Sequence, residues 1–335
     1  MLEHGGRLRA ASLRYGIAPP HWLDLSTGIN PCGWKVEAVP AAAWLRLPED
    51  DDGLEAAARA YYGTEHLLPV AGSQAAIQAL PQLRAPCRVA VIHPGYAEHA
   101  HAWRRAGHAV TPVAVDELND AVPRSDVLAL IHPNNPTGAR FPPEQLLDWH
   151  ARLAARGGWL IVDEAFMDAT PEHSLASCCP RPGLIVLRSL GKFFGLAGAR
   201  VGFVCAHPEL LARLHSALGP WCVNAPARWV ATAALEDHHW QAAARQRLMT
   251  EGARLRALLT RHRLTPDGGC ALFQWLHTPF AHTLHDALAQ QGILTRLFTE
   301  PHGLRFGLPG NETDWARLDK ALTGLATVKN AEAIA

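Results

Sequence analysis

Short apolar runs alternate with helix-type patterns through the first two-thirds of the chain. Residues 126–131 (DVLALI) are almost continuously apolar, as expected for a strand that is buried on both faces of a sheet. Residues 143–156 carry apolar positions at helical spacing. The other predicted strands in this part are 88–92, 108–113, 159–162, 184–187 and 201–205. Strands that alternate with helices predict an α/β fold with a doubly wound, mostly parallel sheet.

The pattern changes after Pro220. Residues 225–262 are predicted to be helical with little interruption, and short strands mix with helices beyond them. This indicates a smaller α+β domain after the doubly wound one. We expect an N-terminal arm over residues 1–25, a large domain over 26–220 and a small C-terminal domain over 221–335.

Polar and glycine-rich segments follow several of the predicted strands. In open parallel sheets, ligands bind outside the carboxyl ends of the strands, so this placement predicts a site at that edge. The segments are residues 93–96, 134–138, 163–164 and 189–192.

Lysine is rare in this chain. Of 31 basic residues only four are lysines, and one of them, Lys192, lies in the middle of S-L-G-K-F-F-G. Arginine keeps its proton in proteins and cannot act as an amine nucleophile, whereas lysine can. Lys192 is therefore the candidate nucleophilic amine, although its position alone is also compatible with chance.

Two further side chains are candidates for cofactor chemistry. Asp163 ends the apolar run 159–162 and would place a carboxylate in the cleft of the sheet, although an aspartate after a strand also caps helices. Asn135 can donate a hydrogen bond from its side-chain amide to an oxygen on a cofactor ring. The Asn-Pro and Thr-Gly pairs around it also make ordinary turns without a ligand.

A phosphate site is predicted at Gly72, Ser73 and Gln74, which open a helical run. Backbone N–H groups at a helix N-terminus and a serine hydroxyl bind phosphate, but a serine N-cap without a ligand has the same sequence. Ser189 and Arg200 flank the lysine and can add a hydroxyl and a guanidinium. An amine, a carboxylate, an amide donor and a phosphate cradle are the groups that pyridoxal 5'-phosphate (PLP) requires.

The segment S-L-G-K-F-F-G-L-A-G-A-R-V-G-F resembles the lysine motif of fold-type I PLP-dependent aminotransferases. P-N-N-P-T-G and I-V-D-E-A-F lie upstream in the order of the family's other hallmarks, and L-R-F-G contains Arg305 where the family has its substrate-carboxylate arginine. The resemblance covers residues 24–307. It implies a fold-type I structure, PLP bound to Lys192, Tyr96 stacked on the cofactor ring, and a homodimer.

The motifs near the N-terminus are more specific. H-G-G, followed by D-L-S-T-G-I-N-P, is similar to histidinol-phosphate aminotransferases and, more closely, to the threonine-phosphate decarboxylases of cobalamin biosynthesis. In the latter the N-terminal arm helps to bind the substrate phosphate. The resemblance therefore implies that His4, Gly5, Gly6 and Asn30 hold that phosphate, and that Arg305 binds either the phosphate or the carboxylate.

The reaction implied is decarboxylation of L-threonine O-3-phosphate to (R)-1-amino-2-propanol O-2-phosphate, with Lys192 or water returning a proton to Cα. An aminotransferase such as histidinol-phosphate aminotransferase is the alternative, because the two reactions differ only in which Cα bond the site aligns. Phe166 stands where many aminotransferases have a tyrosine, which weakens the case for simple transamination. A non-catalytic PLP-fold module is more remote, because Lys192, Asp163 and Arg305 are all present.

Composition and short motifs argue against several other classes of protein. The 31 basic and 31 acidic residues balance, which gives no support to nucleic-acid or anionic-membrane surfaces. No apolar run approaches the ~18 residues of a membrane span, and no secretory signal is visible. The seven cysteines lack C-x-x-C spacing, and the histidine pairs lack a matching cysteine or carboxylate set at ligand spacing. Phe193 breaks the nucleotide P-loop motif, which requires serine or threonine after G-K. We expect a cytoplasmic enzyme for a small phosphorylated amino acid, without a metal.

Overall fold

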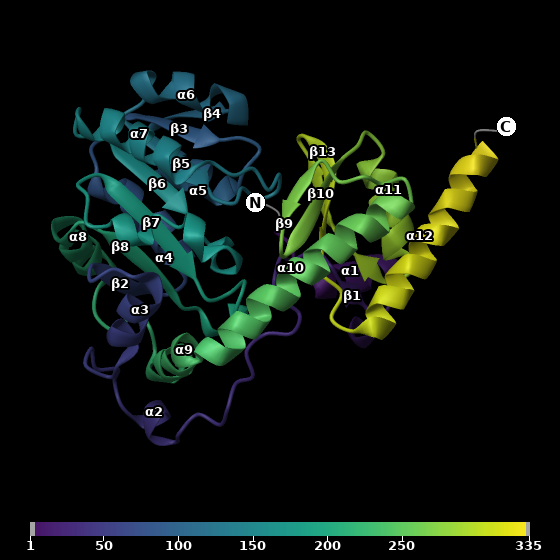
Figure 1. Cartoon of the computed structure of the whole chain (residues 1–335), viewed down its shortest axis with the longest axis horizontal. Helices are drawn as coiled ribbons and strands as arrows, with labels where there is room; N and C mark the ends of the chain where they lie inside the picture. Colours follow the sequence, from purple (N-terminus) through teal and green to yellow (C-terminus); the bar gives the residue numbers. More distant parts are fainter. Residues whose placement is uncertain (1–3, 333–335) are drawn as a thin grey trace. The chain divides into compact units, whose positions relative to one another are not determined.

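The computed structural model of the chain describes residues 4–332. The chain divides into two compact units. Unit 1 contains Met1–Cys32, Pro136–Gly138 and Gln246–Ala335, and unit 2 contains Gly33–Asn135 and Ala139–Arg245. Each unit is built around its own sheet (Figure 1).

Unit 2 contains a seven-stranded sheet with the order β2-β8-β7-β6-β5-β3-β4. The strands β3 to β7 run parallel, whereas β8 is antiparallel to both of its neighbours. The predicted doubly wound, mostly parallel sheet is therefore confirmed. The strands are β2 (Leu67–Val70), β3 (Arg88–Ile92), β4 (Ala109–Val113), β5 (Val127–Ile131), β6 (Trp159–Asp163), β7 (Leu184–Ser189) and β8 (Gly202–Ala206).

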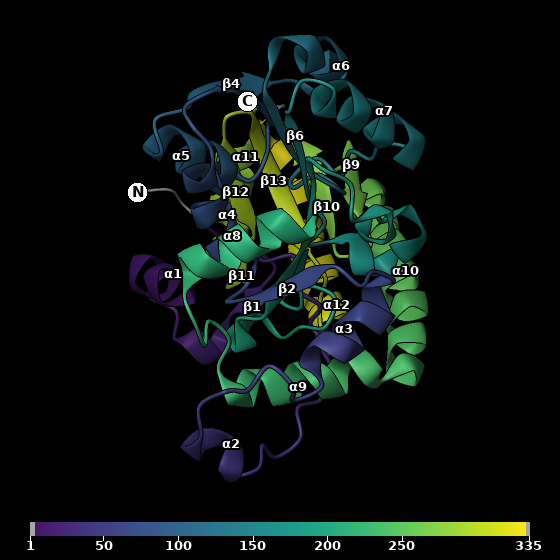
Figure 2. The ribbon, with the colours of Figure 1, turned by 90° about the vertical axis from the view of Figure 1, so that its left-hand side faces the viewer.

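Both faces of this sheet are buried, which explains the continuous apolar runs. All five residues of β5 are buried, although successive side chains of a strand point to opposite faces. On one face, Ile161 and Leu187 pack with Ile77, Trp103 and other apolar side chains of the covering helices. The longer helices of unit 2 are α3 (Leu54–Tyr62), α4 (Ser73–Ala79), α5 (Ala97–Arg105), α7 (Pro143–Ala154), α8 (Pro208–Leu218) and α9 (Ala225–Glu236), of which α3 and α9 lie side by side (Figure 2).

The long helical region predicted over residues 225–262 consists of two helices. After α9 ends at Glu236, Asp237 separates it from α10 (His238–Arg261). The Asp237 carboxylate accepts hydrogen bonds from the Trp240 N–H, at 2.9 Å, and from the Trp34 indole N–H, at 3.0 Å. An aspartate that caps a helix in this way interrupts the run, and an apolar pattern alone does not reveal it. The boundary between the two units falls within α10.

Unit 1 contains a four-stranded antiparallel sheet with the order β12-β13-β10-β9. The short strand β1 (Leu23–Asp24) pairs in parallel with β11 (Ile293–Leu294), so the N-terminal residues are an integral part of this unit. The other elements are α1 (Leu8–Tyr15), β9 (Gly268–Cys270), β10 (Phe273–His277), α11 (Ala281–Ala289), β12 (Arg296–Thr299), β13 (His302–Gly307) and α12 (Glu312–Glu332).

Candidate active site

The cofactor-binding candidates of unit 2 follow the carboxyl ends of parallel strands. Tyr96 follows β3, Asn135 follows β5, Asp163 ends β6, and Ser189 ends β7. In the ladder, Ile131 pairs with Asp163, and Asp163 pairs with Leu187, so these ends meet at one edge. Edges of this kind are where open parallel sheets bind ligands.

Asp163 is a buried carboxylate with a defined orientation. It is 3% exposed, and its Oδ1 accepts a hydrogen bond of 3.1 Å from the backbone N–H of Ala165. Its Oδ2 lies 2.9 Å from Nε2 of His99, a residue of α5 that is 1% exposed. A buried carboxylate is costly without such partners, and these two contacts offset the cost of burying Asp163 at the end of β6.

His99 was not among the residues predicted for the site. It lies three residues after Tyr96, and the centroids of the two rings are 6.2 Å apart. Asp163 points to the face of the sheet on which α5 packs, because it follows Ile161 by two residues. In the sequence only the short distance from Tyr96 hinted that His99 belongs to the site. A histidine that is simply buried in the core would look the same in the sequence.

Gly72, Arg200 and the first residue of α4 lie together at the ends of β2 and β8. Gly72 has φ +72°, and a Cβ atom there would lie 2.6 Å from Nη2 of Arg200. A Cβ at Gly202 would lie 2.5 Å from the backbone nitrogen of Ser73. The glycines therefore keep the backbone N–H groups and the guanidinium close to one another. This cradle, which a side chain would fill, fits a phosphate group.

Gln74 and Tyr96 are joined by a hydrogen bond. The Tyr96 hydroxyl donates to Oε1 of Gln74 at 3.1 Å, and Nε2 of Gln74 donates to Glu98 at 2.9 Å. Burial, reinforced by the negative charges of Glu98 and Asp163, raises the pKa of Tyr96 to about 12. The phenol therefore stays protonated at neutral pH and keeps its role as donor.

Lys192 extends from a loop that its neighbours hold in place. Phe193 and Phe194 are fully buried and contact Trp240, with ring centroids 5.4 and 5.6 Å from the indole. The Lys192 Nζ lies 5.7 Å from the ring centroid of Phe166, which is also buried. The hydroxyl of Ser189 accepts from the N–H of Gly191 at 3.2 Å, which shapes the start of this loop.

A buried ion cluster lies behind these residues, and no local pattern in the sequence indicates it. Arg188 precedes Ser189, Glu164 follows Asp163, and the Arg188 Nη1 donates to Glu164 Oε2 at 2.5 Å. The second Nη of Arg188 donates to Asp168. Arg188 is 1% exposed. Because alternate strand residues face opposite ways, the cluster ties β6 and β7 together on the face away from Asp163.

Replacing Arg188 with methionine is expected to lower the free energy of unfolding by about 3–5 kcal/mol. The reason is that Glu164 and Asp168 would remain buried without their cation. Urea denaturation followed by circular dichroism measures the change. The matched control is Arg261→Met, which removes an exposed pair with Asp319 and should cost less than about 1 kcal/mol. Equal stability of Arg188→Met and wild-type protein would contradict the prediction.

Three motifs that are distant in sequence meet at Ser26 in unit 1. The Gly6 N–H donates to Ser26 Oγ at 2.7 Å, and Arg305 Nη2 donates to the Ser26 carbonyl oxygen, also at 2.7 Å. The structure thus brings together the H-G-G, D-L-S and L-R-F-G segments. His4 is exposed, whereas Asn30 is buried, with its Oδ1 accepting from Arg247 at 3.0 Å.

Arg296 is a second arginine beside Arg305, which the sequence analysis did not predict. The two residues are register partners on the antiparallel strands β12 and β13. Burial, together with the positive charge of Arg296, lowers the pKa of Arg305 to about 10. Two guanidiniums opposite each other repel unless an anion lies between them, so the pair suits a phosphate or a carboxylate. The register of two strands was needed to find it.

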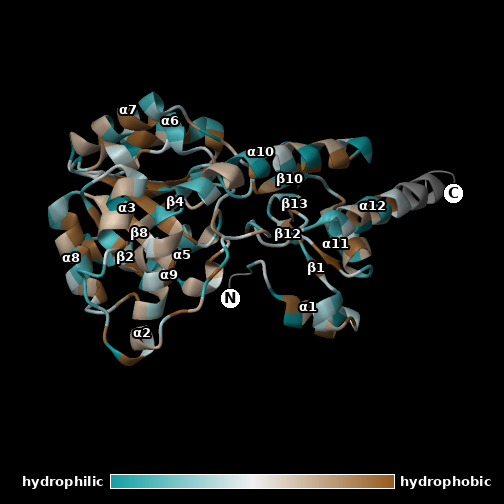
Figure 3. Ribbon diagram, turned by 60° about the horizontal axis from the view of Figure 1, so that its bottom comes forward, coloured by the Kyte–Doolittle hydropathy of each residue, from teal (hydrophilic) through white to brown (hydrophobic). Residues whose placement is uncertain are grey.

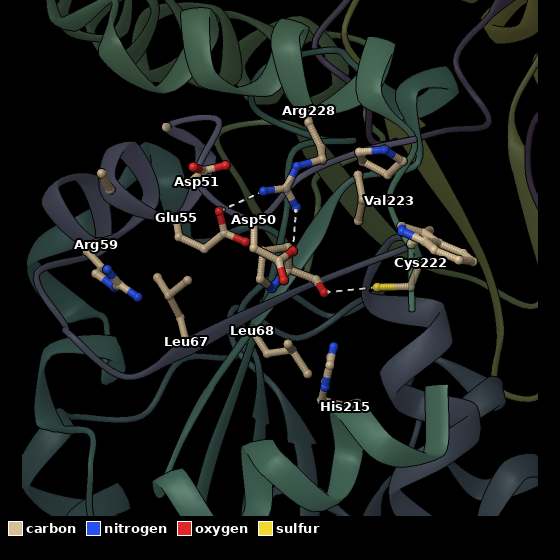
Figure 4. A pocket seen from close by; sticks show the side chains of 15 residues that line it. Asp50, Asp51, Glu55, Arg59, Leu67, Leu68, His215, Cys222, Val223 and Arg228 are labelled. Atoms are coloured by element: carbon tan, nitrogen blue, oxygen red, sulfur yellow. Dashed lines mark hydrogen bonds and ion pairs between the residues drawn. The ribbon is translucent and has the colours of Figure 1, made fainter. Parts of the chain in front are cut away.

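A cavity of about 480 Å³ in unit 2 contains none of the predicted residues (Figure 4). Arg228 points into it and donates to both Asp52 and Glu55 at 2.5–2.7 Å, joining α9 to the start of α3. Asp52 and Glu55 are therefore engaged in holding the helices together. Across the described residues, no group of three or more histidine, cysteine, aspartate or glutamate side chains is arranged to hold a metal. None of the described helices is long and apolar enough to cross a membrane.

Comparison with known proteins identifies relatives along nearly the whole chain. A family model described as aminotransferase class I and II matches residues 47–325. A threonine-phosphate decarboxylase from Pseudomonas aeruginosa is 59% identical over 324 residues, which are 97% of this chain and 98% of that protein. A second threonine-phosphate decarboxylase, from a Sinorhizobium species, is 42% identical and covers 96% of this chain and 97% of its own length.

The fold has relatives among solved structures as well. Histidinol-phosphate aminotransferase from Sinorhizobium meliloti, in complex with pyridoxal-5'-phosphate, superposes with a TM-score of 0.85. The match covers 98% of this chain and 96% of that one at 19% identity, so it bears on the fold alone. The resemblance predicted from the lysine, asparagine and aspartate motifs is confirmed: the chain belongs to the aminotransferase class I and II family.

Proposed function

We propose that this protein is a PLP-dependent decarboxylase that converts L-threonine O-3-phosphate to (R)-1-amino-2-propanol O-2-phosphate and CO2, a step of cobalamin biosynthesis. The observation that carries the proposal is the 59% identity to a threonine-phosphate decarboxylase over nearly the full length of both chains. Histidinol-phosphate aminotransferases are more distant, at 29–34% identity. Phe166, in place of a tyrosine, also weakens the case for simple transamination.

The residues of unit 2 fit PLP. The buried carboxylate of Asp163 suits the pyridinium nitrogen, and the cradle of Gly72 and Arg200 suits the phosphate. When bound, PLP supplies a sink for the electrons left behind as a bond to the substrate Cα breaks. We assign the cofactor to Gly72, Ser73, Gln74, Tyr96, Asn135, Asp163, Ser189, Lys192 and Arg200.

The protein's own groups then determine orientation and proton transfer. His99 holds Asp163 in one orientation, and the neutral Tyr96 phenol is held by Gln74. Lys192 carries the amine that binds the cofactor and can return a proton to Cα. Phe166 places an apolar ring on one side of that amine, with its centroid 5.7 Å from Nζ.

Binding of the substrate's two anionic groups is assigned to unit 1. L-Threonine O-3-phosphate carries a carboxylate and a phosphate, and Arg296 and Arg305 offer two guanidiniums from facing strand positions. His4, Gly5, Gly6 and Asn30 complete the proposed set. Arg296 was absent from the sequence-based expectation and is added here on the strand register.

The test is release of CO2 from L-threonine O-3-phosphate by the PLP-loaded protein, with no keto acid added. We expect CO2 and an equal amount of the amine phosphate. L-Threonine without the phosphate is the control and should be a far poorer substrate. If no CO2 is released but histidinol phosphate reacts with 2-oxoglutarate, the protein is an aminotransferase and the proposal is wrong.

We also propose that the active form is a homodimer. An apolar groove of about 810 Å³ in unit 2 is lined by Trp44, Leu47, Leu196 and Trp221, with the first two and Trp221 59–67% exposed. Figure 3 shows hydrophobic residues at α2 (Ala42–Leu45), in the same region. Large exposed apolar patches mark interfaces, and this one adjoins the loop that follows Lys192.

Light scattering on the PLP-loaded protein tests the dimer and should give twice the mass of one chain. Trp44→Glu is expected to shift the protein toward monomer, because a charge would be buried in the interface. Leu13→Glu is the matched control, since Leu13 is 87% exposed on α1 and lies outside the groove. A monomeric wild type would rule out this interface.

We propose that the protein is cytoplasmic. Its binding partner is the substrate, a small phosphorylated amino acid. The seven cysteines are thiols rather than disulfides, as expected in a reducing compartment. Redox labelling of the thiols in cell extracts would check this, and a protein oxidised at these cysteines in the cell would contradict it.

A further inference from the structure

The hydroxyl of Ser26 donates one hydrogen bond and accepts another. Ser26 is 2% exposed, and its Oγ lies 2.6 Å from Oδ1 of Asp24 and 2.7 Å from the backbone nitrogen of Gly6. A carboxylate oxygen can only accept, so the hydroxyl proton is directed to Asp24. The lone pairs of Ser26 Oγ then accept the N–H of Gly6. Asp24 fixes the geometry further by accepting the Ser26 N–H at 2.9 Å.

The backbone of Ser26 is just as closely packed. A Cβ atom at Gly5 would lie 2.3 Å from the Ser26 carbonyl oxygen, so only glycine allows this approach. Gly6 has φ +78°, a conformation that residues with a side chain rarely adopt. Gly5 is therefore required for the close approach to the Ser26 carbonyl. Gly6 is required for its positive φ, and its N–H donates to the Ser26 hydroxyl.

The same residue reaches Arg305. The Ser26 carbonyl oxygen accepts a 2.7 Å hydrogen bond from Nη2 of Arg305, a buried guanidinium. Ser26 therefore contacts the segment that carries His4 through its hydroxyl, and a proposed anion-binding arginine through its carbonyl. The N–H of Gly6 is already engaged by this serine, so its contribution to the substrate site is to place the segment.

We propose that Ser26 is a positioning residue for recognition of the phosphorylated substrate. The Ser26 hydroxyl holds residues 4–6 in the position from which His4 would contact the anionic group of the substrate. The Ser26 carbonyl oxygen orients Arg305 beside them. This inference rests on the proposed function for the identity of the substrate. It predicts that loss of the hydroxyl weakens substrate binding and leaves the chemical step unchanged.

Ser26→Ala is the central variant. We expect KM for L-threonine O-3-phosphate to rise about tenfold, as for loss of one well-placed hydrogen bond, with kcat within about twofold of wild type. Inorganic phosphate, used as a competitive inhibitor, should lose a similar factor in affinity. Ser26→Thr keeps the hydroxyl and should restore KM to within about threefold of wild type.

The matched control is Ser12→Ala. Ser12 lies on α1 in the same unit, and its Oγ is buried without a hydrogen-bond partner in the described structure. Its loss should leave KM unchanged. Unchanged KM in Ser26→Ala, a fall in kcat alone, or equal damage in the alanine and threonine variants would each overturn the proposal.

Hydrogen exchange separates this inference from the proposed function. In Ser26→Ala the amide of Gly6 should lose protection, whereas the amide of Gly16, which donates to the Ser12 carbonyl at 3.0 Å, should keep it. A wild-type protein that releases no CO2 would refute the proposed function while this comparison still reports on the contact. Equal protection of Gly6 in both proteins would overturn the role of Ser26.

Discussion

Lys192→Ala protein is expected to release CO2 at least about 10⁴-fold more slowly than wild type. In the proposed function Lys192 would supply both the amine that binds the cofactor and a group that can return the proton, and no arginine can replace either role. Borohydride reduction of wild-type protein, followed by peptide mass spectrometry, should locate the cofactor on Lys192. Steady-state assays with L-threonine O-3-phosphate measure the loss.

The control for this variant is Lys35→Ala. Lys35 is an exposed lysine of unit 2, and its removal should leave the rate within about twofold of wild type, in the range of ordinary surface changes. Full activity of Lys192→Ala, or reduction that labels another lysine, would show that the assignment of the amine is wrong.

The second large effect is expected for Asp163→Asn, with a fall in kcat of about 10³-fold. The substitution keeps the shape of the side chain but removes the buried charge that would pair with the pyridinium nitrogen. The loss is therefore electrostatic, and KM should change much less than kcat. Measurement of both constants, together with the absorption spectrum of the bound cofactor, distinguishes this result from a folding defect.

His99→Gln provides a graded comparison for the aspartate. The histidine contacts Asp163 and holds its orientation, so we expect a smaller loss of about 10–100-fold, typical of residues that support a functional side chain. If His99→Gln lost as much activity as Asp163→Asn, the histidine would have a direct role. If Asp163→Asn kept wild-type kcat, the carboxylate would not pair with the cofactor.

Much of the candidate site could be predicted because it depends on residues that are close in sequence. The end of an apolar strand indicates where Asp163 lies, and the scarcity of lysine draws attention to Lys192. Helix starts and turns are equally local, which is why Ser73 could be placed at a helix start and Asn135 in a turn after a strand. The family resemblance added the roles of these residues and the identity of the cofactor.

The residues that were missed depend on contacts between distant segments. His99 reaches Asp163 across 64 positions, and Arg188 reaches Glu164 across 24. Arg296 becomes a candidate for anion binding only because the strand register places it opposite Arg305. The amino-acid pattern of each segment is compatible with a bland role, and no local property distinguishes a buried histidine in a core from one that supports a carboxylate.

The sequence by itself determined the α/β class, the parallel orientation of most strands and the candidate residues of the cofactor site. Apolar periodicity and the punctuation by glycine and proline are local properties, and they are enough to specify which elements form. Only the tertiary structure decided the antiparallel orientation of β8, the break at Asp237 and the convergence of three motifs on Ser26. Those features arise from hydrogen bonds whose partners are brought together by burial of the whole core, and a linear pattern does not encode their pairing directly.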